Sequence, residues 1–400
     1  MKLTIETKTL RAALSVVAPA VPRICLIPAL LCARLRLLAK QSGDQDYPEV
    51  LEICCTSLDA RLTAEIPCRS QGKVKRDLLL PMKTTLALVK LFDQRETQIS
   101  RLSETGINIA AGDCEYCLHT PDPADFPEAI GSADWRNPEA VTVECKPDLS
   151  AKFTGNELAA MLRGVRYAAS DGSDNRYVLE SVLFEFNDES LRLVSTDGKR
   201  LAIVERKLDE PAERAAQYVV PVAAVDMLTR ALAAQARENG AVEVRLTNDH
   251  ITMTCSECHS LESLELKAKL IDSTYPNYRQ VVHGLESKAR VSVDRKDFLR
   301  AVQRISLIAQ DPSAFGMVLT FDETMVIRSV DGRAIERVTP LSFSGEKVET
   351  RLNPRYVLDF LNAADDETIH LQVGWGDQPI CLTDGDNGKV SYIAPMRSIG

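Results

Sequence analysis

The sequence has no apolar run long enough to span a bilayer, and its first residues lack the charged and then apolar pattern of a secretory signal. Its eleven cysteines are odd in number and scattered along 400 residues, a usage that does not favour a disulfide framework. We therefore expect a cytoplasmic protein without membrane contact, whose reduced thiols pack as small apolar groups.

The sequence also lacks the patterns of common catalytic sites. Neither glycine-rich phosphate loop, of the dinucleotide-binding or the Walker type, occurs, and there is no HExxH or GxSxG. The five histidines are isolated from one another: His119, His250, His259, His283 and His370. A metal-assisted hydrolase would need clustered ligands, so we predict a protein that is not an enzyme and holds no cofactor.

Two CxxC motifs are the strongest candidates for a metal site, Cys114 with Cys117 and Cys255 with Cys258. Four thiolates at this spacing can hold a tetrahedral zinc ion. Both motifs fall in segments with the alternation of strands, however, and on an extended strand residues i and i+3 point to opposite faces. The motifs also occupy similar positions in different thirds of the chain. We predict no metal site, and zinc is the alternative.

What the sequence does contain is one pattern repeated three times. Each copy opens with a short alternating strand that leads into an apolar helix, in residues 1–23, 151–171 and 289–311. The copies begin roughly 140 residues apart, a period typical of domains.

Two further elements recur between these openings. A strand, a proline or its equivalent, and a helix occupy residues 78–92, 218–232 and 351–363, and the proline is expected in the first helical turn. A hairpin around an Asp-Gly turn, which is Asp-Ala in the first copy, occupies residues 56–66, 195–205 and 329–338.

These repeats predict an α+β fold of three similar domains, each with two helices packed on antiparallel sheets. The predicted domains are residues 1–140, 141–285 and 286–400. A chain of this length exceeds a single core, and each third is long enough to bury its own.

The net charge of −9 argues against a nucleic-acid partner, but the distribution of charge along the chain favours one. The six predicted helices carry twelve basic and only five acidic residues, so the rest of the chain is strongly acidic. Basic helices on an acidic body suit a duplex bound along one helical surface. The alternative is that the helices expose Lys and Arg on an ordinary solvated face.

Six segments carry a resemblance to a known family. They are 125–127 (DFP), 176–179 (RYVL), 183–185 (LFE), 195–202 (STDGKRLA), 275–279 (YPNYR) and 392–397 (YIAPMR). In their order and spacing the chain resembles the bacterial sliding clamps, the DNA polymerase III beta subunits, over essentially its whole length.

The resemblance implies a non-catalytic processivity factor that encircles duplex DNA and tethers the replicative polymerase. Two subunits would join head to tail in a ring of six similar domains, with sheets outside and helices lining the hole, so that one chain is half of the ring. The implied partners are double-stranded DNA of any sequence, the DNA polymerase III catalytic subunit, the clamp loader, other polymerases and repair proteins with clamp-binding motifs, and a second copy of the chain.

The resemblance also implies three sets of site residues. Phosphate contacts would come from Lys8, Arg11, Arg23, Lys83, Lys90, Arg163, Arg166, Arg230, Arg300 and Arg304. A partner-peptide cleft between domains 2 and 3 would comprise Arg176, Leu179, Thr196, Gly198, Lys199, Arg200, Leu201, Pro276, Val281, Ile393, Pro395, Met396 and Arg397. The dimer interface would use Tyr116, Leu307 and Ile308.

Some positions depart from the family. Lys199 stands where histidine is frequent, and Gln280 stands where arginine is frequent, so peptide preference is expected to differ. Ordinary core packing is the alternative for the dimer residues Tyr116, Leu307 and Ile308, and for the aliphatic cleft residues Leu179, Leu201 and Val281. A scaffold that forms no ring is the alternative function.

Overall fold

The computed structural model describes residues 2–71, 77–128, 149–172, 176–212, 214–235, 240–256, 258–309, 315–375, 378–385 and 388–396. Its contacts divide it into two units, Met1–Ala159 with Ala223–Leu270 and Ala160–Val222 with Ile271–Gly400. Within the described ranges, no helix has the length and apolar character needed to cross a membrane.

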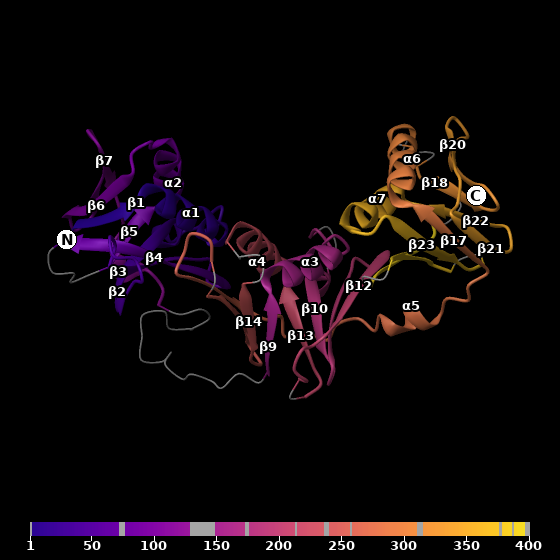
Figure 1. The fold of residues 1–400 in the computed structure, drawn as a ribbon, viewed down its shortest axis with the longest axis horizontal. Coiled ribbons are helices and arrows are strands. Elements are labelled where there is room, and N and C mark those ends of the chain that lie inside the picture. Colours follow the sequence, from indigo (N-terminus) through magenta and orange to yellow (C-terminus); the bar gives the residue numbers. More distant parts are fainter. Residues whose placement is uncertain are drawn as a thin grey trace. The chain divides into compact units, whose positions relative to one another are not determined.

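The first unit contains a twelve-stranded antiparallel sheet in the described ranges (Figure 1). Its strands are β1 (Lys2–Glu6), β2 (Cys32–Gln41), β3 (Glu49–Thr56), β4 (Ala60–Gln71), β5 (Leu78–Pro81), β6 (Glu96–Ser103), β7 (Gly106–Ala111), β8 (Cys114–His119), β9 (Leu149–Thr154), β14 (Ala241–Leu246), β15 (His250–Cys255) and β16 (Ser263–Lys269). The helices α1 (Thr7–Val17) and α2 (Met82–Leu91) pack side by side, and α1 lies on β3 and β4. Most of α4 (Val222–Gln235) also belongs to this unit.

The second unit contains a nine-stranded and a four-stranded antiparallel sheet, counted over the same ranges. The nine strands are β10 (Ser181–Phe186), β11 (Ser190–Thr196), β12 (Arg200–Lys207), β13 (Ala216–Pro221), β17 (Ala289–Asp294), β21 (Ser342–Gly345), β23 (Thr368–Val373), β24 (Ile380–Asp384) and β25 (Lys389–Ile393). The four strands are β18 (Met317–Phe321), β19 (Met325–Ser329), β20 (Ile335–Val338) and β22 (Val348–Leu352). The helices are α3 (Gly155–Arg166), which begins in the first unit, α5 (Arg279–His283), α6 (Arg295–Ile308) and α7 (Pro354–Ala363). Short 3-10 turns in the two units are η1 (Ala18–Ala20), η2 (Pro28–Leu31), η3 (Pro123–Asp125) and η5 (Tyr177–Leu179).

The helix starts follow local rules. The side chain of Asp294 caps α6 by accepting a hydrogen bond from the Asp297 amide, and Asn353 caps α7 in the same way. Pro354 is the first residue of α7, as predicted. Pro81 and Pro221 instead end β5 and β13, one residue before their helices, so the predicted position is wrong by one residue there. Proline tolerates both positions because neither requires its missing N–H.

The three predicted hairpins form. Gly198 and Gly332 have φ of 84° and 73°. In the first hairpin Leu58, with φ of 76°, occupies the position of Gly198, because the pair Thr56–Arg61 corresponds to the pair Thr196–Leu201. A left-handed conformation costs a residue with a Cβ about 1–2 kcal/mol. The first hairpin therefore retains the repeated turn without the glycine that favours it.

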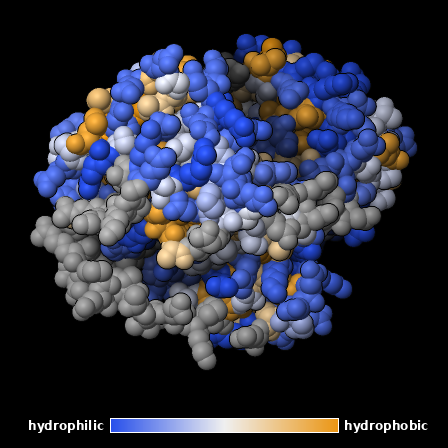
Figure 2. Space-filling view, turned by 60° about the vertical axis from the view of Figure 1, so that its left-hand side comes forward, coloured by the Kyte–Doolittle hydropathy of each residue, from blue (hydrophilic) through white to orange (hydrophobic). Residues whose placement is uncertain are grey.

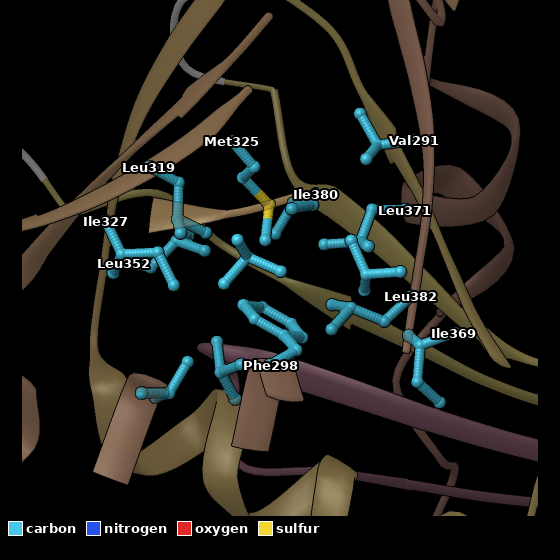
Figure 3. Close-up of a cluster of buried hydrophobic side chains, with 14 of the residues drawn as sticks. Val291, Phe298, Leu319, Met325, Ile327, Leu352, Ile369, Leu371, Ile380 and Leu382 are labelled. Atoms are coloured by element: carbon cyan, nitrogen blue, oxygen red, sulfur yellow. The ribbon is translucent and has the colours of Figure 1, made fainter. Parts of the chain in front are cut away.

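The core of the second unit lies on one face of its nine-stranded sheet. Alternation along β24 directs Ile380 and Leu382 towards Phe298 of α6, and directs Cys381 to the other face. Figure 3 shows Phe298 beneath the aliphatic side chains of several strands. Truncating such a fully buried phenylalanine to alanine typically costs 3–5 kcal/mol.

Strand pairing continues across the domain limits predicted from the repeats. β4 pairs with β16, and β12 pairs with β25, in both cases antiparallel. The central third therefore shares one sheet with the first third and another with the last third. This sharing explains why contacts divide the chain into two units although the sequence pattern has three copies.

Candidate partner-binding cleft and charged helices

The second Asp-Gly hairpin, between β11 and β12, is fixed by local hydrogen bonds. Thr196 Oγ1 donates to the Arg200 carbonyl oxygen at 2.6 Å and accepts from the Gly198 amide at 3.0 Å. The Asp197 carboxylate accepts from the amides of Lys199 and Arg200. The φ of 84° at Gly198 favours glycine in this turn, and a Cβ there would lie 2.9 Å from Arg176 Nη2, so the guanidinium would have to shift.

The C-terminal segment lies beside this hairpin. Arg200 is opposite Ile393 in the β12–β25 ladder, and the Ala394 amide donates to the Lys199 carbonyl oxygen at 2.9 Å. Further along the same segment, the Met396 amide donates to the Arg351 carbonyl oxygen at 2.7 Å. The predicted cleft residues from two distant segments are thus brought together.

The connecting segment, residues 271–288 between β16 and β17 in the second unit, contains α5. It covers the face of the nine-stranded sheet that is opposite α6 and α7. Tyr275 and Tyr278 are buried there in one apolar cluster with Leu201 and Tyr392. Pro276 is exposed and Val281 is 40% exposed. The connecting segment therefore buries its tyrosines and presents two apolar side chains to solvent.

The structure sorts the predicted cleft residues by exposure. Leu179, Leu201 and Ile393 are 1%, 4% and 0% exposed. Ile393 packs in the cluster of α6 and α7, on the face of β25 opposite Tyr392, so Ile393 does not line the cleft. Tyr392 faces the connecting segment instead and was missed, although the two-residue alternation of β25 could have indicated it. The exposed or half-buried members are Arg176, Thr196, Gly198, Lys199, Arg200, Pro276, Val281, Pro395 and Met396, and Arg397 lies outside the described residues.

Arg200 is the electrostatic centre of this region. Its Nη1 donates to Asp359 Oδ2 of α7 at 2.6 Å, and its Nε donates to Asp197 Oδ2 at 3.0 Å. The guanidinium carbon lies 4.5 Å from the ring centroid of Tyr356 and 5.7 Å from that of Tyr167. Burial raises the pKa of the Tyr167 hydroxyl well above its usual value, so this ring stays neutral beside the cation.

The predicted DNA-binding cations fall into two groups. Exposed side chains are those of Lys8, Arg23, Lys83, Lys90, Arg163, Arg230, Arg300 and Arg304. Arg11 is half-buried and donates to the carbonyl oxygens of Val89 and Phe92 at 3.2 and 2.7 Å, at the end of α2. Arg11 is thus a tie between two helices that satisfies terminal carbonyls, and not a free phosphate ligand as predicted.

Two other members of the set also have partners. Arg304 donates to both oxygens of Glu336, at 2.7 and 2.9 Å. Arg166 is half-buried and has interactions within the protein. These contacts reduce the charge that Arg166 and Arg304 can offer to a phosphate.

The predicted dimer residues are accessible in the single chain. Leu307 and Ile308 at the end of α6 are 69% and 46% exposed, which excludes core packing for Leu307. Tyr116 is half-buried on β8, at the end of the twelve-stranded sheet, where it stacks on Phe92 with ring centroids 5.8 Å apart.

Other exposed apolar side chains were not predicted from the sequence. Ile24 and Leu26 lie in the loop just after Arg23 and are 93% and 99% exposed. Figure 2 shows that hydrophobic residues on one face of the molecule form separate patches on a largely hydrophilic surface.

The two CxxC motifs lie apart. Cys114 and Cys117 are exposed on β8. Cys255 and Cys258 are buried with their sulfur atoms 3.7 Å apart, so the expectation that i and i+3 point to opposite faces is wrong for this pair, because β15 ends at Cys255. The strands β7, β6, β1, β4 and β16 separate β8 from β15 in the sheet. Among the residues that the structure describes, His, Cys, Asp and Glu form no group of three or more that could hold a metal ion.

Comparisons with known proteins agree with this architecture. Residues 152–277 match the central domain of the DNA polymerase III beta subunit, and residues 284–397 match its C-terminal domain. Together these matches span more than half of the chain. The chain belongs to the DNA polymerase III beta subunit family.

Relatives match over nearly the whole chain. The beta sliding clamp of Rickettsia bellii is 25% identical over 99% of this chain and 100% of its own length. That of Pseudomonas aeruginosa is 24% identical over 99% and 100%. A crystal structure of the P. aeruginosa sliding clamp bound to griselimycin covers 100% of both chains, with a TM-score of 0.85 at 23% identity.

The family establishes the class of function. This chain has the sliding-clamp fold of mixed helices and antiparallel sheets, and it is a processivity clamp of DNA replication. It is a non-catalytic component, and the sequence prediction that it is not an enzyme is confirmed.

Proposed function

We propose that two copies of this chain close head to tail into a ring around duplex DNA, each with domains 1–140, 141–285 and 286–400. The observation that best supports this is the exposed apolar end of α6, where Leu307 and Ile308 lie together in solvent. Apolar area removed from water contributes about 25 cal/mol per Å², so a subunit contact there is stabilising. A contact between two different surfaces can close into a ring, and Tyr116 on β8 supplies the second surface.

Sheet edges support the same contact. β8 ends the path of the twelve-stranded sheet and β20 ends the four-stranded sheet. Uncovered edge strands present unpaired backbone groups to other chains. In a closed ring these edges lie at the subunit contacts, where another chain covers them.

In this proposal the ring encloses the DNA, and its contacts with the DNA are electrostatic. Exposed Lys and Arg on α1, α2, α3, α4 and α6 contact phosphates, which carry no sequence information. The exposed set comprises Lys8, Lys83, Lys90, Arg163, Arg230, Arg300 and Arg304, with Arg23 from the adjoining loop. Such contacts permit sliding because no base edge is read.

The cleft receives linear segments of partner proteins. Exposed Pro276 and Val281 and the half-buried Met396 provide an adaptable apolar surface next to the backbone of the Asp-Gly hairpin. The partners are the DNA polymerase III catalytic subunit, the clamp loader, and other polymerases and repair proteins. Griselimycin, bound in the P. aeruginosa structure, binds this cleft as well. The site of action is the bacterial cytoplasm.

Sedimentation velocity over a range of concentrations tests the ring. The expected species is a dimer of 44.1 kDa chains. A monomer at every concentration up to that of a cell's replication proteins would contradict the proposal. Calorimetric titration with griselimycin tests the cleft separately, and the Met396→Ala variant is expected to bind it more weakly.

A further inference from the structure

A buried carboxylate joins the connecting segment to the sheet beneath it. The side chain of Glu185 on β10 is only 3% exposed. Its Oε2 accepts from Tyr278 Oη at 2.5 Å, and its Oε1 accepts from Arg279 Nη2 at 2.7 Å. Gln217 of β13 donates to Oε1 at 2.5 Å, and Arg192 Nη1 of β11 lies 3.5 Å from Oε2. Such pairing is what makes a buried carboxylate tolerable.

These four donors come from two parts of the second unit, the nine-stranded sheet and the connecting segment. Arg192 and Gln217 belong to the strands on either side of β10, whereas Tyr278 and Arg279 are at the start of α5. Arg192 Nη1 also lies 3.4 Å from Tyr278 Oη. Burial, and then the hydrogen bond to Glu185, raise the pKa of Tyr278, so its hydroxyl remains a donor at neutral pH.

Apolar contacts account for only part of the attachment of α5: Val282, and Tyr278 just before the helix, pack in the cluster that contains Leu201 and Tyr392. The helix is five residues long, and a helix of this length is not stable by itself. Beside α5 a pocket of about 250 Å³ that opens to solvent is lined by Arg192, Ile203, Glu205, Tyr278, Arg279 and Val282, among others. Because apolar packing does not fill this side of α5, the hydrogen bonds to Glu185 contribute to its position.

The tied residues lie between two exposed members of the cleft. Pro276 precedes Tyr278 by two positions, and Val281 follows Arg279 by two. We propose that Glu185 is a positioning residue of the partner-binding cleft, which holds Pro276 and Val281 in place through Tyr278 and Arg279. This inference rests on the proposed function of the cleft. Glu185 itself contacts no partner, because it is buried.

Glu185→Gln and Glu205→Gln form a matched pair of variants. Both carboxylates interact with Arg192, and Glu205 accepts from its Nη2 at 2.8 Å. Unlike Glu185, Glu205 makes no hydrogen bond to the connecting segment among the described residues; its side-chain partners are Ser190 and Arg192. Calorimetry with griselimycin is expected to show about tenfold weaker binding for Glu185→Gln, the effect of one charge-assisted hydrogen bond. Glu205→Gln is expected to stay within about twofold of the wild type.

Hydrogen exchange gives the readout that separates positioning from general stability. The amides of Val281 and Val282 both donate to Tyr278 O. They should exchange faster in Glu185→Gln than in Glu205→Gln, while amides of β11 and β12 exchange alike in the two variants. Tyr278→Phe removes one of the donors to Glu185 and leaves the carboxylate itself in place, and it should weaken griselimycin binding by about threefold.

Equal griselimycin affinity in Glu185→Gln and Glu205→Gln would overturn the proposal, and so would equal exchange at Val281 and Val282. If Glu185→Gln fails to fold, wild-type affinity and exchange in Tyr278→Phe would overturn it. Absence of griselimycin binding by the wild type would refute the proposed cleft instead. The exchange comparison would then still show whether Glu185 holds α5.

Discussion

Arg200 of β12 and Asp359 of α7 form an ion pair in which Nη1 lies 2.6 Å from Oδ2, although 159 residues separate them in the sequence. The same guanidinium binds Asp197 in its own hairpin and lies over the ring of Tyr356. The side chain of Arg200 is only 10% exposed. One cation therefore links the Asp-Gly hairpin of the cleft to a helix of the C-terminal third.

Replacing Arg200 with lysine should destabilise this link. Lysine cannot donate to both carboxylates in the fork geometry of a guanidinium, nor stack in the same way on Tyr356. We expect Arg200→Lys to lower the free energy of unfolding by about 2 kcal/mol, measured by urea denaturation. Arg328→Lys, which alters a more exposed pair with Glu349, should cost less than about 0.5 kcal/mol. Equal costs would show that the Arg200 network adds nothing beyond a surface ion pair.

Ile308→Lys should prevent dimer formation without affecting the cleft. It places a charge in the proposed subunit contact, where desolvation without a partner is unfavourable. Sedimentation at low concentration is expected to show a monomer that still binds griselimycin.

Val281→Lys is the reciprocal control. Val281 and Ile308 are exposed to similar extents, 40% and 46%, but they belong to different proposed surfaces. Val281→Lys should sediment as a dimer and bind griselimycin at least about tenfold more weakly. An Ile308→Lys dimer would refute the assignment of α6 to the subunit contact.

Exposed lysines of α2 should set part of the salt dependence of DNA binding. Replacing Lys83 and Lys90 with glutamine removes up to two phosphate contacts, which should flatten the slope of log K against log salt by up to about 2. Fluorescence anisotropy with a short duplex at several salt concentrations measures this slope. Lys207→Gln, an exposed lysine on β12, should leave the slope unchanged.

The buried thiols should resist modification and ionisation. Burial raises the pKa of Cys32 to about 11 and that of Cys68 to about 12. Because these values exceed the ordinary thiol value of 9.0, the unfolded chain releases the protons first. Stability is therefore unaffected by these groups below pH 9 and falls as the pH rises towards 11 and 12.

A thiol reagent at pH 8 tests the exposure of the cysteines. Cys145 lies outside the described residues and is replaced with serine for this test. In that background the exposed Cys114 and Cys117 should react fast, and Cys32 and Cys68 should react only on unfolding. Rapid reaction of Cys68 in the native chain would contradict its burial.

The sequence predicted best where the cause is local. Glycine at Gly198 and Gly332 indicated the repeated turn because few other residues favour positive φ. The first hairpin, at residues 56–66, was predicted as well, but Leu58, which adopts the positive φ there, is not a residue type that indicates such a turn. Alternation along β25 places Ile393 and Tyr392 on opposite faces, so the sequence itself indicates that only one of the two can face the cleft.

Contacts between distant segments could not be predicted. Whether Arg11 is a free cation depends on carbonyl groups of α2, which are about eighty positions away in the sequence. Arg304 depends in the same way on Glu336. The buried tie at Glu185 was invisible because its donors come from three segments, although Glu185, Tyr278 and Arg279 all lie in motifs that carried the family resemblance.

Topological retention on DNA tests the central claim most directly. The chain is loaded onto nicked circular duplex DNA with a bacterial clamp loader, the partner proposed above, and is separated from free protein by gel filtration. The circle is then cut once. The dimer is expected to stay with the circle at moderate salt and to be released on linearisation, because the phosphate contacts alone are then too weak to retain it. Retention on the linear product, or absence from the intact circle, would contradict a ring that encircles DNA.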